Sequence, residues 1–148
     1  MIRDAKYRRQ GRYLRFFGEE LYPIARAEFP MVDAVAPIPL HRDRHWERTF
    51  NQAERLTEEL GRIWGISVLS CLVKVKRTIP QSSLSGPARR KNLKDAFQWR
   101  GNGIIPKSVL LVDDVITTGA TLEQCARTLR RAGVRAVYGL TIARAVKK

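Results

Sequence analysis

Residues 110–121 read LLVDDVITTGAT, and this stretch constrains the fold more than any other part of the chain. Four consecutive apolar residues at 109–112 predict a buried strand of a parallel sheet, in which both faces are covered. Apolar residues then recur at helical spacing over residues 121–132, and another apolar run begins at Ala136. This order predicts a βαβ unit, in which a helix joins two parallel strands and covers one face of their sheet.

Upstream of this unit the chain continues to alternate between strand and helix patterns. One helix is predicted over residues 13–24, where Pro23 should end or kink it, and another over residues 51–64, ended by Gly65. Short apolar runs predict three more strands, within residues 32–40, 66–75 and 97–99. We therefore expect an α/β fold in which a parallel sheet is flanked by helices on both faces.

The chain has 148 residues, 44% of them apolar, which is enough to build one core. We expect a single domain over residues 1–148, with an N-terminal helical segment at 1–30 and a flexible loop at 76–95, where the sequence is polar, basic and rich in turn residues. Two cysteines far apart argue against a disulfide framework. No apolar run is long enough to span a membrane, and the N-terminus lacks the apolar core of a secretory signal, so we expect a cytoplasmic protein.

Lysine and arginine number 28 against 14 aspartates and glutamates, which gives a formal net charge of +14. Such an excess favours polyanionic partners, such as nucleic acid, phosphorylated metabolites or anionic lipid. Charge alone does not distinguish among these partners, so the choice depends on the residues of a specific site.

The loop after residues 109–112 has the features of a phosphate site. Ligands of parallel α/β sheets bind beyond the carboxyl ends of the strands, and this loop leads into a helix N-terminus, whose free N–H groups attract anions. Glycine lets the backbone approach a ligand closely, and threonines add hydroxyl donors. The residues that we predict to bind substrate here are Val115, Thr117, Thr118, Gly119, Ala120 and Thr121.

Asp113 and Asp114 stand between the apolar run and this loop. Carboxylates repel a phosphate, but they can accept hydrogen bonds from sugar hydroxyls or hold a hydrated Mg²⁺ ion. One loop could therefore bind both ends of a ribose 5-phosphate, with Mg²⁺ at Asp113 and Asp114, directly or through water.

Acidic residues at the end of a strand also occur in helix caps and in other classes of protein. Aspartate and threonine cap helices well, so the stretch could simply begin a helix. The Mg²⁺-binding strand of a nucleoside triphosphatase looks similar, but that machinery requires a G-x-x-x-x-G-K-[ST] loop, which this sequence lacks. A phosphate-accepting receiver domain also has acidic residues at a strand end, although it does not need a T-T-G-A-T sequence directly after them.

The longer stretch VLLVDDVITTGAT resembles the phosphoribosyl pyrophosphate (PRPP) signature of type I phosphoribosyltransferases. Three blocks, APIPLHRDRHWERTFNQAERLTEEL, KRTIPQSSLSGPARRKNLKDAF and ITTGATLEQCARTLRRAGVRAVYGLTIAR, resemble in that order the ComF/GntX-type family of competence-associated phosphoribosyltransferase-like proteins. The resemblance covers nearly the whole chain from about Lys6. It implies a type I phosphoribosyltransferase fold, Asp113 and Asp114 as catalytic residues, and PRPP with Mg²⁺ as ligands.

The resemblance also assigns residues outside this loop. A pyrophosphate-binding loop falls after the first core strand, and its candidates are Pro39, Leu40, His41 and Arg42. A flexible loop that can close over the substrate follows later in the chain, and its candidates are Arg77, Gln81, Arg89 and Asn92. Two departures stand out. Thr49 replaces a family glycine, and the chain begins after the point where the family's usual N-terminal cysteine-rich zinc module would end, either because the chain is truncated or because this form lacks the module. We therefore expect no zinc in this chain.

For function, the resemblance implies a role in natural competence, the uptake of DNA. One hypothesis is an active or vestigial phosphoribosyltransferase, which would transfer a pentosyl group from PRPP to an unknown acceptor. A second is a catalytically inactive accessory protein that binds single-stranded DNA through its positive charge. A third is a PRPP-responsive regulator. A second copy of the chain, forming a homodimer, and proteins of the competence machinery are the expected protein partners.

Overall fold

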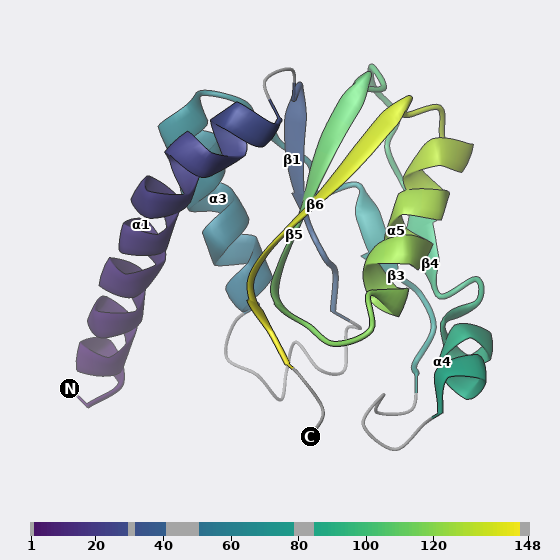
Figure 1. Ribbon diagram of the computed structural model, residues 1–148, viewed down its shortest axis with the longest axis horizontal. Helices are drawn as coiled ribbons and strands as arrows, with labels where there is room; N and C mark the ends of the chain where they lie inside the picture. The colour runs from purple at the N-terminus through teal and green to yellow at the C-terminus, as the bar shows by residue number, and fades with distance from the viewer. Residues whose placement is uncertain (1, 30–31, 41–50, 79–84, 146–148) are drawn as a thin grey trace.

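The computed structural model describes residues 2–29, 32–40, 51–78 and 85–145, which form an α/β arrangement (Figure 1). Parallel strands make a central sheet, helices cover both of its faces, and a small antiparallel pair of strands packs on one side. The helices are α1 (Ile2–Glu28), α3 (Gln52–Trp64), α4 (Gly86–Leu93) and α5 (Ala120–Arg131). The strands are β1 (Ala34–Pro37), β2 (Ser67–Val68), β3 (Leu72–Lys74), β4 (Phe97–Trp99), β5 (Ser108–Ile116) and β6 (Ala136–Arg144).

The central sheet has the strand order β2-β1-β5-β6, and all of its pairings are parallel. Helices α1 and α3 cover one face, and α5 covers the other (Figure 1). The antiparallel pair β3–β4 packs on the α5 side, where Leu72 and Phe97 join the same buried cluster as Leu111 and Cys125. The predicted α/β fold, a parallel sheet with helices on both faces, is thus confirmed.

Side chains of β5 alternate between two buried clusters, one on each face of the sheet. Val109 and Leu111 belong to the cluster beneath α5, whereas Leu110 and Val112 belong to the cluster beneath α1 and α3. All four are at most 1% exposed. Burying one such side chain stabilises the fold by about 1.5–3 kcal/mol, which is why an uninterrupted apolar run predicts a central strand well.

A polar clasp aligns the starts of β1 and β5. The N–H and hydroxyl groups of Ser108 donate to Oδ2 of Asp33 at 2.8 and 3.0 Å, and the Asp33 N–H donates to the Ser108 carbonyl at 3.2 Å. The donors on Ser108 hold the pKa of the Asp33 carboxyl below its usual range. A slip of one residue would turn the apolar side chains of β5 to the wrong faces, so this clasp supports the observed pairing of Ala34 with Val109.

Helix α1 differs from the prediction because it does not end near Pro23. It is continuous from Ile2 to Glu28, with Pro23 inside it. A proline in a helix interior is destabilising by about 3 kcal/mol, and packing against α3 offsets this cost. Ala25 is 1% exposed, and a Cβ atom on Gly18 would lie only 3.0 Å from Cδ1 of Ile63 in α3. Tertiary contacts therefore outweigh the local effect of the proline.

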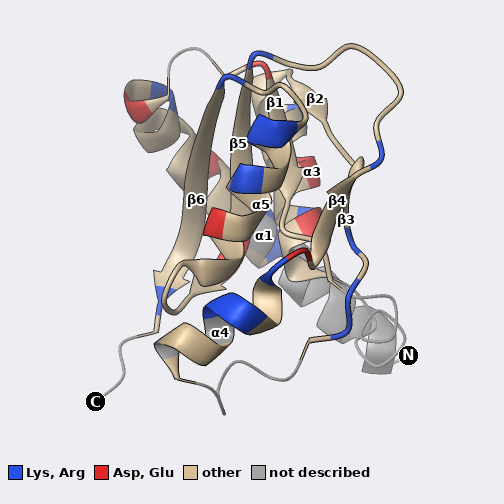
Figure 2. Ribbon diagram, turned by 90° about the vertical axis from the view of Figure 1, so that its right-hand side faces the viewer, with Lys and Arg blue, Asp and Glu red and all other residues tan. Residues whose placement is uncertain are grey.

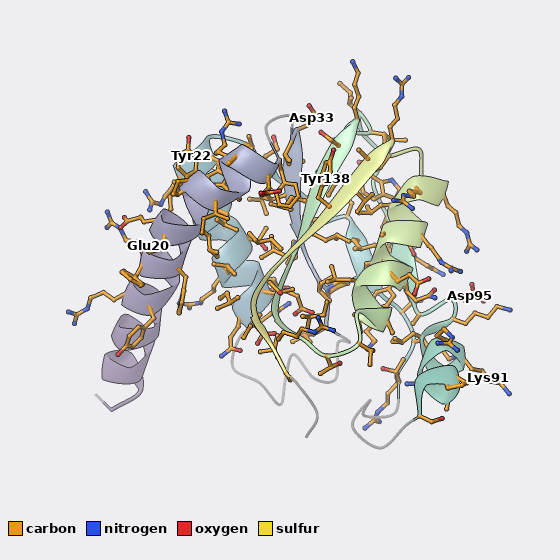
Figure 3. All side chains as sticks on the ribbon, in the orientation of Figure 1. Glu20, Tyr22, Asp33, Lys91, Asp95 and Tyr138 are labelled. Carbon is orange, nitrogen blue, oxygen red and sulfur yellow. The ribbon has the colours of Figure 1, made fainter. Side chains whose placement is uncertain are left out.

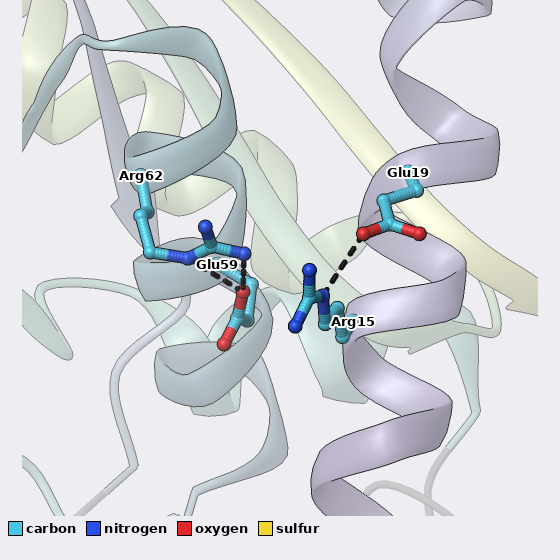
Figure 4. A network of polar contacts seen from close by, with 4 residues as sticks. All are labelled: Arg15, Glu19, Glu59 and Arg62. Carbon is cyan, nitrogen blue, oxygen red and sulfur yellow. Dashed lines mark hydrogen bonds and ion pairs between the residues drawn. The ribbon is translucent and has the colours of Figure 1, made fainter.

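Ion pairs line the exposed rim of α1 and α3 (Figure 4). Arg15 pairs with Glu19 at 2.9 Å, and Arg62 pairs with Glu59 at 2.8 Å. Glu19 and, more weakly, Glu59 raise the pKa of the Arg15 guanidinium, so a weak attraction also links the two helices. No helix within the described ranges is both long and apolar enough to cross a membrane.

Two other predicted segments are wrong in their boundaries. Residues 66–75 do not form one buried strand, because β2 pairs with β1 and is exposed, whereas β3 pairs with β4 in the small sheet. One apolar run therefore serves two sheets. The predicted flexible loop at 76–95 contains helix α4, while residues 79–84 lie outside the described residues.

Replacing Gly61 by alanine should destabilise the fold, because α3 meets the strand after it at this glycine. A Cβ atom there would lie 2.5 Å from Cγ2 of Val68 and 3.1 Å from the Ile66 carbonyl oxygen. We expect the free energy of unfolding, measured in urea, to fall by about 1–3 kcal/mol despite the better helix propensity of alanine. Gly103→Ala is the matched control, since nothing lies within 4 Å of its Cβ position. Equal losses in the two variants would contradict the packing explanation.

Candidate functional site

The candidate site lies where β5 extends beyond its neighbour β1. Strand β1 ends at Pro37, opposite Val112, whereas β5 continues to Ile116 and stays paired with β6. Asp113 and Asp114, here called the acid pair, are therefore part of the strand and not of the following loop, which corrects the predicted strand end at residue 112. At the acid pair, and within residues 2–29, 32–40, 51–78 and 85–145, β5 is paired with β6 on one flank and with no strand on the other.

The backbone groups that would extend the β1–β5 ladder are hydrogen-bonded to side chains instead. The Ile38 N–H donates to the Val112 carbonyl at 2.9 Å, and the next bond of a parallel ladder would run from the Asp114 N–H to the Ile38 carbonyl. Instead, the Asp114 N–H donates to Oδ1 of Asp113 at 2.9 Å, and the Ile38 carbonyl accepts from Nδ2 of Asn51 at 3.2 Å. The ladder therefore ends at the acid pair.

Asn51 positions the segment after β1, a role that the sequence analysis missed. Its side chain is 4% exposed, caps α3 through Oδ1, and holds the Ile38 carbonyl through Nδ2. Of the predicted pyrophosphate-loop residues, Pro39 and Leu40 follow Ile38 directly and are half-buried, while His41 and Arg42 lie outside the described residues. The start of this predicted loop is thus held beside the end of β5.

The turn after β5 leads into α5 through Gly119. This residue has a left-handed φ of 79°, which strains any other side chain, and it occupies the N-cap position of α5. Because the cap residue has no side chain, it leaves the first helix amides to other partners, and the helix dipole adds positive potential there. Of the other predicted binding residues, Thr117 and Thr118 are exposed on the turn and Val115 is exposed on β5. In the first turn of α5, Ala120 is buried and Thr121 is half-buried. The structure brings these residues together, and their role in binding stays a prediction.

The environment of the acid pair disfavours a negative charge on Asp113. Burial, a hydrogen bond with the Asp114 carboxyl and the charge of Asp114 together raise the pKa of Asp113 to about 7. The Val115 N–H donates to Oδ1 of Asp114 at 2.8 Å. Near neutral pH Asp113 therefore binds a proton that an ordinary aspartate would release. A cation or a hydroxyl donor at this point would favour the charged carboxylate instead.

Lys74 is a cation near the site that the sequence analysis also missed. Its Nζ donates to Oγ1 of Thr78 at 2.7 Å and lies 5.7 Å from the centre of the Phe97 ring. Burial and the charge of Asp113 raise the pKa of the Cys125 thiol, and the charge of Lys74 lowers it. Strand β3 packs on the α5 side of the sheet, and Asp113 follows Val109 and Leu111 at alternate positions of β5 on that same side, so Lys74 and Asp113 belong to elements that meet there. Strand β3 has only three residues, so the alternation of buried and exposed side chains along it is too short to show from the sequence on which side of the sheet Lys74 lies.

The predicted flexible-loop residues are only partly placed. Arg77 is exposed beyond β3, Asn92 is half-buried in α4, Arg89 belongs to the backbone of α4, and Gln81 lies outside the described residues. Helix α4 packs against α5. Asn92 is therefore carried by a helix next to α5 and not by a loop.

Within the described residues, no three His, Cys, Asp or Glu side chains converge to form a metal site. The acid pair offers two carboxylates, and Mg²⁺ commonly binds through one or two carboxylates together with waters and substrate phosphates. Such a cation would favour the charged form of Asp113, whose pKa burial and Asp114 raise to about 7. The donor set is therefore compatible with a Mg²⁺ ion that arrives with a phosphorylated ligand.

Comparison with known proteins identifies relatives of this chain. Competence protein F of Haemophilus influenzae is 41% identical over 121 residues, which are 80% of this chain and 53% of the relative. The chain belongs to the ComF family. DNA utilization protein YhgH of Escherichia coli is 36% identical over 111 residues, 71% of this chain and 46% of that relative. The chain spans about half the length of these curated relatives. No family model matches it.

Solved structures show the fold of this ComF-family chain. Adenine phosphoribosyltransferase from Saccharomyces cerevisiae superposes with a TM-score of 0.61, covering 89% of this chain and 68% of that protein. The two sequences are 13% identical, so the likeness concerns the fold alone. The ComF-family chain therefore has the type I phosphoribosyltransferase fold that the sequence predicted.

Asp113→Asn should make the chain more stable above neutral pH. The folded chain binds a proton at Asp113 with a pKa of about 7, whereas an unfolded aspartate has a pKa of about 4. Stability due to this group is therefore present at low pH and is lost as the pH rises from about 4 to about 7. Asparagine removes this slope, and at pH 8 we expect a gain of about 1–2 kcal/mol in urea denaturation, reduced by the partial exposure of the group.

The control for this experiment is Asp95→Asn, which changes an exposed aspartate that has a left-handed φ of 58°, a conformation that asparagine tolerates. Its pH dependence should match that of the wild type. An Asp113→Asn variant with the wild-type slope between pH 4 and pH 7 would show that Asp113 does not hold the proton.

Proposed function

We propose that this ComF-family chain binds PRPP, or a related 5-phosphorylated ribose, together with Mg²⁺ at the end of β5. The observation that carries the proposal is the junction of two features: an acid pair with a raised pKa at Asp113, and the glycine N-cap of α5 at Gly119. Carboxylates suit sugar hydroxyls and a cation, whereas helix amides suit a phosphate. The fold shared with an adenine phosphoribosyltransferase supports the same ligand class.

Each part of PRPP has a chemically matched position in this proposal. The 5-phosphate binds at the N-terminus of α5, with Thr117 and Thr118 as hydroxyl donors. The ribose hydroxyls donate to the acid pair. The pyrophosphate lies toward residues 38–40, which are held next to β5 by the Ile38 N–H bond to the Val112 carbonyl at 2.9 Å. Mg²⁺ would neutralise the charge between the acid pair and the pyrophosphate.

The proposed reaction is transfer of the phosphoribosyl group to a nitrogen acceptor. The bond between the anomeric carbon and the pyrophosphate oxygen breaks, a carbon–nitrogen bond forms, and the acceptor nitrogen loses a proton. Positive charge develops on the ribose ring in an oxocarbenium-like transition state, and the nearby carboxylates would stabilise it. Holding the ribose in place on a strand would add the benefit of fixed orientation.

We further propose that this site serves the uptake or use of DNA in the cytoplasm. The support comes from the relatives, which are named competence protein F and DNA utilization protein, and from the net charge of +14. A regulator that binds PRPP without turnover would use the same acid pair and the same turn. Binding and turnover are therefore tested separately.

Calorimetric titration of PRPP with Mg²⁺ tests the binding. We expect saturable binding by the wild type and a loss of about 100-fold or more in Asp113→Asn/Asp114→Asn, because each hydrogen bond to a charged group contributes about 1.5–3 kcal/mol. Glu58→Gln, an exposed carboxylate on α3, is the matched control and should bind like the wild type. Urea denaturation of the double variant verifies that it is folded. Failure of the wild type to bind, or equal binding by the folded double variant, would contradict the proposed site.

Turnover is measured as pyrophosphate release from PRPP in the presence of purine and pyrimidine bases and simple amines. Release that depends on the acceptor and disappears in Asp113→Asn/Asp114→Asn is the result expected of an enzyme. Binding without release by any acceptor would favour the PRPP-responsive regulator.

A further inference from the structure

A concave surface separate from the candidate site lies on the side of the molecule formed by α4, α5 and β4. Figure 2 shows lysine and arginine residues of α4 and α5 on this side. Two hollows are present here: one between α4 and α5 has a volume of about 320 Å³, and one between β4 and α5 has a volume of about 330 Å³. Both are of the size that small ligands occupy. Together they are called the α4–α5–β4 groove.

The hollow between α4 and α5 is positively charged. Five exposed cations line it: Arg90, Lys91, Lys94, Arg127 and Arg131. Two acids also line it, Glu123, paired with Arg127 at 2.7 Å, and Asp95, which is 3.9 Å from Arg131. Five cations against two acids leave a net charge of +3. Lys91 and Asp95 project outward from this side of the molecule (Figure 3). The hollow therefore attracts an anion.

Two of the six residues that line the hollow between β4 and α5 are aromatic. Phe97 and Trp99 come from alternate positions of β4, and Thr128 and Ala132 line the hollow from α5. Gly101 holds the indole of Trp99 from one side, because a Cβ atom at Gly101 would clash with three atoms of the ring. An aromatic ring that is half-buried and held in place can serve as a platform on which a base stacks.

Arg131 lines both hollows and so connects them. An aromatic platform next to a group of cations matches a base that is joined to a phosphate. We propose that the α4–α5–β4 groove binds a nucleotide unit, with the base beside Trp99 and the phosphate among Lys94, Arg127 and Arg131. A free nucleotide and a nucleotide within a single strand present the same base and phosphate, so both are sources of this chemistry.

This inference is independent of PRPP binding. The groove begins along α5 at Glu123, whose N–H donates to the Gly119 carbonyl at 2.9 Å, and extends to Arg131 at the other end of the helix. Its cations therefore lie on α4, at the end of α4 and along the flank of α5, whereas the proposed PRPP site uses the N-terminus of α5. Loss of one site leaves the residues of the other in place.

Fluorescence anisotropy of a labelled single-stranded oligothymidylate of about ten nucleotides tests the groove. The variant Lys94→Ala/Arg131→Ala removes two cations of the groove, and the matched control Arg130→Ala/Arg135→Ala removes two exposed cations that do not line it. We expect the groove variant to bind about 10-fold or more weakly, with a salt dependence reduced by about two released ions, and the control to change by less than about 3-fold. Equal losses would show that net charge alone binds the strand, which overturns the proposal.

The base is tested with an abasic strand of the same length, which should bind about 10-fold or more weakly than the oligothymidylate. Equal binding of the two strands would overturn the proposal, as would failure of the wild type to bind either a strand or a nucleoside monophosphate. Displacement of the strand by a nucleoside monophosphate at millimolar concentration or below identifies a free nucleotide as a ligand, and displacement by single strands only identifies nucleic acid. Asp113→Asn/Asp114→Asn should bind the strand like the wild type, which separates this inference from the proposed function.

Discussion

The end of the hydrogen-bond ladder between β1 and β5 is the constraint on which the candidate site depends. The clasp between Asp33 and Ser108 aligns the two strands at their start, and Asn51 with Asp113 takes up the backbone groups that would otherwise extend their pairing. Continued pairing would place a strand along the flank of the acid pair. Because the pairing stops, this flank of β5 has no strand partner among the residues that the structure describes, while β6 supports the opposite flank. The interactions that end the sheet therefore also create the site.

Sequence reasoning succeeds here where the signal is local. Helix α3 begins at a capping Asn51 and ends at Gly65 with a left-handed φ of 65°, and both signals lie in the few residues around each end. Sequence reasoning fails where contacts between distant residues determine the structure. Pro23 is an example, because the packing of α1 on α3 keeps the helix continuous through this proline. The same division holds within the site. The acid pair and Gly119 form a contiguous motif that could be read directly, whereas the tether from Asn51 to Ile38 joins residues 13 positions apart and becomes visible only in the fold.

The acid pair is a group of acidic side chains in a chain whose net charge is strongly positive. The sequence has a net charge of +14, yet burial and Asp114 dominate the proton affinity of Asp113. Some surface cations are paired with glutamates of their own helices, as Arg127 is with Glu123 at 2.7 Å. A buried carboxyl that resists ionisation destabilises the folded chain at neutral pH. Such local costs are characteristic of residues kept for binding or chemistry.

The acid pair is carried by a strand that β6 supports along its whole length. This pairing reaches Ile116 and Arg144, and the Ala145 N–H donates to the Ile116 carbonyl at 2.9 Å. Carboxylates on a loose loop would have to be ordered when a ligand binds, and that ordering would subtract from affinity. Here the ordering has already occurred during folding, so the site is preorganised. Under the proposed function, discrimination among sugar phosphates at the acid pair follows ring geometry and hydroxyl placement, because the carboxylates cannot shift far to meet a poorly matched ring.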